Sequence, residues 1–198
     1  MLPPVVDPPA AAPAPTLSLA DDPAPTLPGV AVLGINTARS LTFKDGRINR
    51  DQVDFIRESF SRTPDNAMRI LVTHHPLFAM EVEGEVERAI GRQELALDVV
   101  EECGVDMVLA GHHHHASSHD ASDLVTRAGG VLVVQAGTAT STRVREQERS
   151  FNVIDIGEGT ATVAVHAWNG EQFRPTEPRR YDWRDGRWSL HQAKEVAH

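Results

Sequence analysis

The sequence is very poor in cysteine: Cys103 is the only one among its 198 residues. A single cysteine excludes an intrachain disulfide and any zinc site built from several thiolates. The sequence also lacks an apolar run of about 18 residues, so no transmembrane helix is predicted. Lys and Arg are absent from the first 38 residues, so the N-terminus does not resemble a secretory signal with a basic segment. We therefore expect a cytoplasmic protein without a membrane partner.

Basic residues are scarce throughout the chain. There are 19 Lys and Arg against 28 Asp and Glu, which gives a formal net charge of −9. Nucleic-acid binding rests largely on neutralising phosphates, so this balance disfavours nucleic acid as a partner. The hydrophobic share of 40% and the charged share of 24% are typical of a globular protein. The length fits one domain.

Proline is distributed unevenly. Nine of the 13 prolines lie in residues 1–28, among Ala, Asp and Thr. Proline removes backbone donors and fixes φ, so this stretch can form neither a helix nor an inner strand. The sequence predicts a Pro/Ala-rich disordered tail over residues 1–28, followed by a folded portion over residues 29–198.

The folded portion begins with alternating strand and helix patterns. Short apolar runs predict buried strands at Val30–Ile35 and at residues 69–73 and 106–110. Apolar residues at spacings of three and four predict helices over residues 51–62 and 92–103, with Gly104 ending the second. The order β-α-β-α-β predicts an α/β fold with a parallel sheet.

Beyond residue 110 the pattern predicts strands only. The expected strands cover residues 130–135, residues 151–156, Thr160–Trp168 and a last hairpin of residues 181–183 and Arg187–Leu190, joined by Arg184-Asp185-Gly186. The acidic stretch at residues 81–88 reads instead as a solvated loop or a helix face. The chain thus ends in an all-β tail.

Histidine is abundant, and seven of the ten histidines lie between His74 and His119. His74 and His75 follow one predicted strand, while Gly111 and four histidines follow the next. Ligands bind at the carboxyl ends of strands in open α/β sheets, and neutral imidazole is a common ligand of Zn, Mn and Fe. Such a tract can also be a solvated, metal-binding loop, but its pairing with His74 favours a shared metal site. His112 and His114, two residues apart, can point to one centre.

Two segments carry a resemblance to a known family. VTHHPLF at residues 72–78 and LAGHHHH at residues 109–115 resemble the His-x-Pro and Gly-His-x-His motifs of the calcineurin-like metallophosphoesterases. The resemblance spans roughly residues 29–173 and implies an incomplete four-layer α/β/β/α sandwich. It assigns three metal ligands: His74 and His112 to one metal ion, and His114 to the other. His75, Asn36 and Arg39 would lie at the periphery of the site.

The sequence departs from this family in one large respect. The family's Asp-x-His, Gly-Asp-x-x-Asp and Gly-Asn-His motifs occur nowhere in the chain, so the metal-bridging aspartate has no counterpart. The intact family site holds two ions (Mn, Fe or Zn). Three neutral imidazoles can hold at most one. The chain is thus identified as resembling the C-terminal half of a phosphoesterase.

Two functions follow from these observations. The first is metal-dependent hydrolysis of a phosphate ester, most readily a diester, by metal-activated water, with this fragment inactive alone. The alternative is a non-catalytic metal- or partner-binding half-domain. Half of a sandwich would expose a sheet edge and an apolar face, so a separate N-terminal half or a homo-oligomer is the expected partner.

Overall fold

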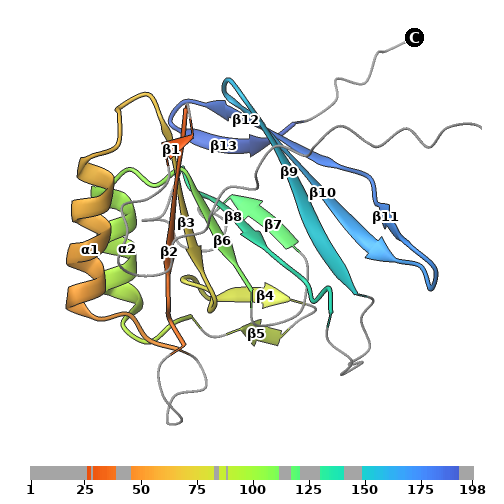
Figure 1. Cartoon of the computed structure of the whole chain (residues 1–198), viewed down its shortest axis with the longest axis horizontal. Coiled ribbons are helices and arrows are strands. Elements are labelled where there is room, and N and C mark those ends of the chain that lie inside the picture. Colours follow the sequence, from red (N-terminus) through yellow and green to blue (C-terminus); the bar gives the residue numbers. More distant parts are fainter. Residues whose placement is uncertain are drawn as a thin grey trace, which may run out of the picture.

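The structure is a computed structural model of the chain, and it describes residues 26–27, 29–38, 46–82, 85–87, 89–111, 117–120, 130–140 and 149–191. These residues form three layers: two helices, a six-stranded sheet and a five-stranded sheet (Figure 1). The order β-α-β-α-β followed by strands confirms the predicted α/β class. Residues 1–25, most of the predicted tail, lie outside the described residues.

The six-stranded sheet has a parallel centre. Its strands run, in spatial order, β1 (Thr26–Leu27), β2 (Val30–Ile35), β3 (Met68–Thr73), β6 (Met107–Ala110), β8 (Leu132–Gln135) and β7 (Ser117–Asp120). Neighbours among β2, β3, β6 and β8 pair in parallel, whereas β1 and β7 pair antiparallel at the two edges. The carboxyl ends of the four parallel strands therefore share one edge of the sheet.

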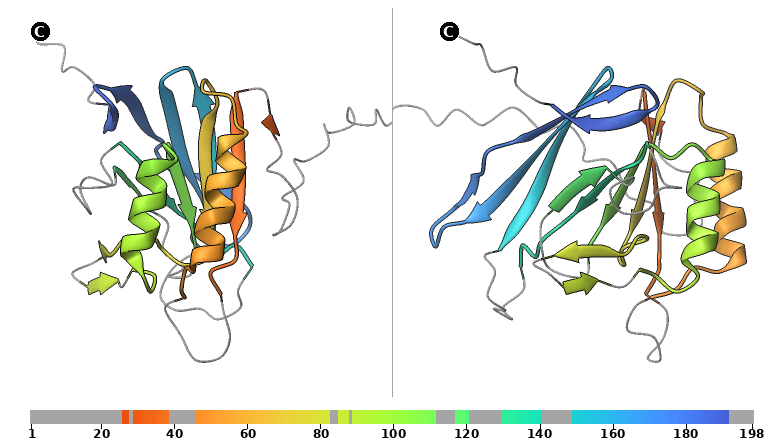
Figure 2. Two further views of the ribbon diagram at one scale, coloured as in Figure 1. Left: turned by 90° about the vertical axis from the view of Figure 1, so that its left-hand side faces the viewer. Right: turned by 180° about the vertical axis from the view of Figure 1, so that it is seen from behind.

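Both described helices cover the same face of this sheet (Figure 2). α1 (Arg50–Ser61) begins at Asn49, whose side chain and that of Gln52 form a reciprocal capping box. α2 (Gln93–Glu102) ends where Gly104 takes a φ of +58°, as predicted. No helix in the described part of the chain is long and apolar enough to cross a membrane.

The five-stranded sheet is antiparallel and built around its longest strand, β10 (Thr160–Trp168). β9 (Ser150–Gly157) pairs along one side of β10, while β12 (Arg179–Arg184) and β11 (Phe173–Pro175) share the other side. β13 (Arg187–Leu190) closes the hairpin with β12. Asp185 and Gly186 in its turn both have positive φ, of 53° and 77°, as a two-residue type I′ turn requires.

One expectation is wrong in the described structure. Of residues 81–88, the described ones, 81–82 and 85–87, lie neither in a loop nor in a helix but in β4 (Met80–Val82) and β5 (Glu85–Glu87), which pair as a small hairpin. Valine alternates with glutamate on both sides of Gly84, and this period of two suits a strand pair. The many glutamates of this segment led the sequence analysis to expect a solvated loop or helix face instead of a strand pair.

Two cores hold the layers together. Ala31, Leu33 and Ile35 of β2 pack with the helices in the larger core, whereas alternate residues of the parallel strands face the antiparallel sheet. The second core, between the sheets, includes Trp188, whose indole N–H donates to the carbonyl of Asp106 at 3.2 Å. The fully buried apolar side chains of both cores account for the two-sheet arrangement.

Candidate functional site

The carboxyl ends of β3 and β6 lie side by side in parallel pairing. Val72 is in register with Leu109, and the pairing continues past the strand ends because the N–H of Gly111 donates to the carbonyl of His74 at 3.1 Å. His74 and Gly111 therefore leave the sheet from adjacent positions. This edge is where α/β sheets bind ligands.

His74 and His75 differ in burial although their rings are in contact. The His74 side chain is exposed, whereas His75 retains only 4% of its accessible surface. Their ring centroids lie 4.7 Å apart and the ring planes are nearly perpendicular, at 86°. In this bend after β3, the His74 imidazole therefore faces solvent and the His75 imidazole lies in the interior.

His75 is a buried anchor for the loop after β3. The hydroxyl of Thr37, just beyond β2, lies 3.0 Å from Nδ1 of His75 and accepts a hydrogen bond from the His75 backbone N–H at 3.1 Å. The hydroxyl of Thr73 donates to the His75 carbonyl at 2.8 Å. The sequence predicts His75 for the periphery of the site, whereas the structure gives it these interior contacts. Thr37, fully buried, is a residue that the sequence analysis misses.

Asn36 also makes structural contacts. Its side-chain oxygen accepts the N–H of Ala38 at 3.0 Å, which forms a turn directly after β2. Its carbonyl accepts a hydrogen bond from the Gln52 side chain at 2.7 Å and so ties this turn to the start of α1. Asn36 is exposed, near the same sheet edge. Arg39 lies outside the described residues.

The four-histidine segment lies beyond the described part of the chain. His112 and His114 fall in residues 112–116, so of the three predicted ligands only His74 is described. Within the described ranges no group of three or more His, Cys, Asp or Glu side chains is placed to hold a metal ion. The predicted ligand set therefore stays a prediction.

Gln135 is a second polar residue that the sequence analysis misses. It ends β8 in register with Ala110, and its side chain is fully buried. The N–H of Ala136 donates to the carbonyl of Ala110 at 2.8 Å, which carries the β6–β8 pairing past the strand ends. The carbonyl of Gln135 accepts from Asn152 of β9 at 2.9 Å. The only sequence signal is a polar residue that closes an apolar run.

The half-buried carboxyl of Asp106 lies at the opposite edge of this sheet. Burial raises the pKa of the Asp106 carboxyl, and a hydrogen bond from the Arg69 backbone N–H, at 2.7 Å, opposes this shift. Asp106 immediately precedes β6, at the amino end of the parallel strands. Asp106 therefore joins β3 to β6 and lies away from the histidine edge.

Comparisons with known proteins give limited similarity. The sequence matches no known family and no curated protein. Among solved structures, Vps29 from Entamoeba histolytica, crystallised with Zn²⁺, is 14% identical; the match covers 77% of this chain and 99% of that one, with a TM-score of 0.33. GAP50, an anchor in the inner membrane complex of Plasmodium, is 16% identical over 83% of this chain and 50% of its own, with a TM-score of 0.39. A predicted phosphoesterase from Streptococcus pneumoniae is 11% identical over 76% and 96%, with a TM-score of 0.35. Similarity at this level identifies neither a family nor an activity.

Proposed function

We propose that the carboxyl edge of the parallel sheet binds one divalent metal ion (Mn, Fe or Zn) through His74, His112 and His114. We propose further that this ion serves phosphate-ester hydrolysis, most readily of a diester, once carboxylate ligands are supplied by another polypeptide segment. The observation that carries the proposal is the hydrogen bond from the N–H of Gly111 to the carbonyl of His74. It places Gly111, which directly precedes the four-histidine segment in the sequence, beside His74.

The orientation of the His74–His75 pair supports this ligand choice. The His74 imidazole is exposed to solvent at the sheet edge, whereas the His75 imidazole is buried and bonds to the hydroxyl of Thr37. His112 follows Gly111 directly and His114 follows two residues later. Neutral imidazoles suit Zn, Fe and Mn, and three of them with one open position are a common arrangement at zinc.

The chemistry of the donors limits the site to one ion. Residues 36–38, 74–79, 111 and 136–140 follow the four parallel strands and contain no Asp or Glu. A bound metal ion would lower the pKa of a coordinated water and polarise the phosphoryl group. Holding a second cation beside it requires anionic ligands, because neutral imidazoles do not offset the added charge. Hydrolysis through a two-metal site therefore depends on carboxylates from outside these segments.

The lack of carboxylates also favours the alternative, a non-catalytic half-domain that binds metal or a partner. Both functions predict metal uptake at the same histidines. They differ in whether the addition of carboxylate ligands produces turnover. The two are separated by measuring binding and hydrolysis on the same protein preparations.

Metal binding is tested by calorimetric titration of Zn²⁺ and Mn²⁺ into the purified chain. We expect His74→Ala, His112→Ala and His114→Ala each to weaken binding by at least about tenfold, as loss of a metal ligand does. His113→Ala is the matched control, because the residue between two ligands of an extended segment would point away from them. If His113→Ala weakens binding as much as His112→Ala, the ion is held by an unspecific histidine loop.

Hydrolysis is tested with an aryl phosphodiester and Mn²⁺. We expect no turnover by the chain alone. Turnover should follow fusion to an upstream half that carries Asp-x-His, Gly-Asp-x-x-Asp and Gly-Asn-His, and His112→Ala should abolish it. A fusion that binds metal but stays inactive supports the non-catalytic alternative. Chelator-sensitive turnover by the chain alone contradicts that alternative and the need for added carboxylates.

A further inference from the structure

β9 is an edge strand with the composition of an inner strand. Among the described residues it pairs only with β10 (Figure 1). Asp155 is its one charged residue. Phe151, Val153 and Ile156 retain 37%, 37% and 39% of their accessible surface, and they are three of the five exposed large hydrophobic side chains among the described residues. Side chains of a strand point alternately to its two faces, so Phe151 and Val153 lie on one face and Ile156 lies on the other.

The hydrogen bonds around β9 show which backbone groups face its open edge. The N–H of Ser150 donates away from β10, to the carbonyl of Thr138 at 2.9 Å, while the N–H of Trp168 donates to the carbonyl of Arg149. Residues of an antiparallel strand alternate in direction. Phe151, Val153 and Asp155 are thus directed at β10, and residues 152, 154 and 156 direct their N–H and C=O groups outward.

The other described edges are protected in the usual ways. β1 has two residues, and β11 has three and ends at Pro175. β13 has four residues and begins with Arg187, and β7 has the polar sequence SSHD. Short length, proline and charge are how edge strands avoid pairing with other chains. β9 has eight residues, four of them large and apolar, no proline, and Asp155 as its only charge, so it is the least protected of these edges.

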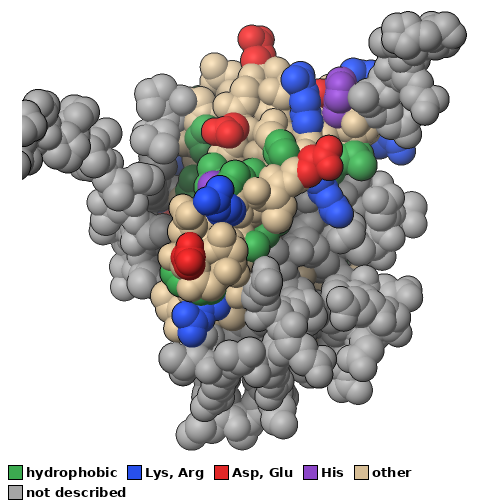
Figure 3. Space-filling view, turned by 90° about the vertical axis from the view of Figure 1, so that its right-hand side faces the viewer, with side chains coloured by type: hydrophobic (Ala, Val, Ile, Leu, Met, Phe, Trp, Pro, Cys, Tyr) green, Lys and Arg blue, Asp and Glu red, His purple; other side chains and the backbone are tan. Residues whose placement is uncertain are grey.

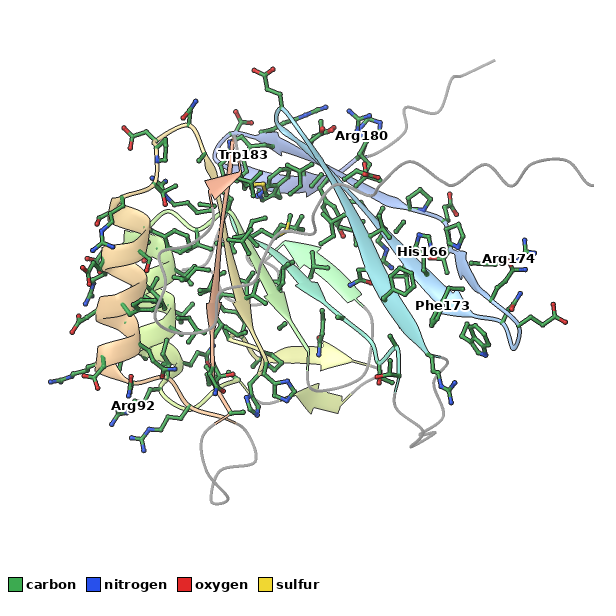
Figure 4. All side chains as sticks on the ribbon, viewed as in Figure 1. Arg92, His166, Phe173, Arg174, Arg180 and Trp183 are labelled. Atoms are coloured by element: carbon green, nitrogen blue, oxygen red, sulfur yellow. The ribbon has the colours of Figure 1, made fainter. Side chains whose placement is uncertain are left out.

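Aromatic side chains gather beside β9. On this side of the molecule, hydrophobic side chains are interspersed with basic and acidic ones (Figure 3). The Phe151 ring stacks on His166 and meets Phe173 edge-on, with centroids 5.0 Å apart in both pairs. His166 and Phe173 lie on the neighbouring strands β10 and β11 (Figure 4). Phe151 is therefore held in place as a preformed apolar contact beside the open edge.

We propose that β9 pairs antiparallel with β9 of a second copy of this chain, about a two-fold axis at Ile154. Ile154 then faces its own symmetry mate, and Asn152 faces Ile156 of the other copy. The outward N–H of Ser150 already donates to the carbonyl of Thr138. The part of the edge that is available for pairing therefore begins at residue 151 or 152. In this register residues 152, 154 and 156 of each copy all pair with outward-facing residues of the other copy. A register centred on residue 152 or 156 would leave some of them without such a partner.

Charge and packing in this register favour a second copy as the occupant. Asp155 lies opposite Val153 of the other copy and not opposite its own mate, so the only charge on β9 meets no like charge across the pair. Ile154 and Ile156 of both copies fall on the side of the first sheet, where Val30 and Val32 are half-buried. Each strand supplies the apolar partner that the other lacks.

The association is opposed by the net charge of −9 on each copy. Long-range repulsion between two such chains weakens as salt shortens the screening length. Dimerisation therefore increases between about 0.02 M and 0.5 M salt. An interface held by ion pairs would respond in the opposite direction.

The first test is light scattering with size exclusion over a range of concentrations and salt. Ile154→Pro removes an outward N–H without removing a β9–β10 bond, and we expect it to lower the association constant at least tenfold. Ile154→Ala keeps that N–H and is the control. Ile156→Lys places a charge at the same edge and should act like the proline. Circular dichroism and the thermal transition verify that each variant folds.

The second test fixes the register by disulfide formation. In a Cys103→Ser background, Val153→Cys and Asp155→Cys lie opposite each other across a non-hydrogen-bonded pair, with a Cα separation of about 4.5 Å, within disulfide range. Oxidation of the two proteins mixed together should give a covalent dimer. Each protein oxidised alone should give far less.

Three outcomes overturn the proposal. A chain that stays monomeric at all concentrations and salts has no such interface. A dimer that neither Ile154→Pro nor Ile156→Lys weakens uses another surface. Protection of the 154 and 156 amides from hydrogen exchange in a monomer shows that the chain itself covers the edge. None of these readouts depends on metal binding or hydrolysis.

Discussion

The hydroxyl of Thr37 and the imidazole of His75 lie 3.0 Å apart although the residues are 38 positions apart in the chain. Each follows a parallel strand, β2 and β3, and each is buried. The contact fixes the loop after β3, in which His75 turns inward and His74 turns outward. The proposed metal ligand His74 thus depends on an interior hydrogen bond that involves its neighbour.

Thr37→Val should destabilise the fold. The change keeps the shape of the side chain but removes its hydroxyl. The hydroxyl accepts a hydrogen bond from the His75 backbone N–H and forms another with Nδ1 of His75, so both are lost. We expect the free energy of unfolding to fall by about 1–3 kcal/mol, measured by urea denaturation. Thr37→Ser retains the hydroxyl and should cost less than half as much. Equal losses in both variants would indicate a packing role only.

Gly46→Ala should destabilise the fold more than the same change at Gly159. A Cβ at Gly46 would lie 2.3 Å from Nδ1 of His75, and the φ of Gly46 is +66°. Gly159 has a φ of +64° but open space around it, so it is the control for backbone strain alone, about 1–2 kcal/mol. We expect Gly46→Ala to cost about 1–3 kcal/mol more, from parallel urea melts. Equal costs would mean that the His75 ring moves aside freely.

The stability of the chain should fall in acid partly through Asp182. A hydrogen bond from His191, at 2.7 Å, lowers the pKa of the Asp182 carboxyl, burial opposes the shift, and Arg180 adds to it. The folded pKa lies below the value of about 3.9 for an unfolded aspartate. Ionised Asp182 therefore stabilises the fold above that pH, and the contribution is lost as the pH falls through the folded pKa.

The measurement for Asp182 is the free energy of unfolding between about pH 6 and pH 2. Asp182→Asn removes the titration and should make the acid side of this profile shallower. Asp185→Asn, at the exposed turn of the same hairpin, is the matched control. An Asp182→Asn profile as steep as that of the unmodified chain would contradict the assignment.

Cys103 should react slowly with thiol reagents. Burial raises the pKa of its thiol, and the neighbouring Glu102 charge raises it further, while Arg57 and Arg69 oppose the shift. The thiolate is the reactive species, so we expect reaction with a disulfide reagent at pH 8 to be several-fold slower than in the unfolded chain. Glu102→Gln should speed the reaction. A native rate equal to the unfolded rate would show that the thiol is neither buried nor perturbed.

Much of the local structure can be predicted from the sequence. β2 and β10 have the predicted bounds, and both helices begin and end within one residue of prediction. The positive φ of Gly104 and the turn at Asp185 and Gly186 also agree. Hydrogen bonds and side-chain periodicity within a few residues determine these features, so a short window of sequence contains the information.

Other features could not be predicted because distant residues determine them. The Thr37–His75 contact and the burial of Gln135 each require a partner that no short window contains. The β4–β5 hairpin is local, and the sequence analysis misses it because its alternating residues are mostly charged. The sequence places His74 and His75 together after one strand, but it does not tell which imidazole faces solvent. That choice depends on the interior hydroxyl of Thr37 and on the space left by Gly46.

The sequence by itself determined the α/β class, predicted two histidine groups at strand ends, and lacks the Asp-x-His, Gly-Asp-x-x-Asp and Gly-Asn-His motifs of the family that it resembles. Local periodicity suffices for the first two conclusions, and the order of the residues for the third. Only the tertiary structure decided that β3 and β6 are neighbours, that His74 faces outward and that β9 lies at an open edge. Strand order and edge position result from pairing between distant segments, and this pairing depends on how the whole chain buries its apolar faces.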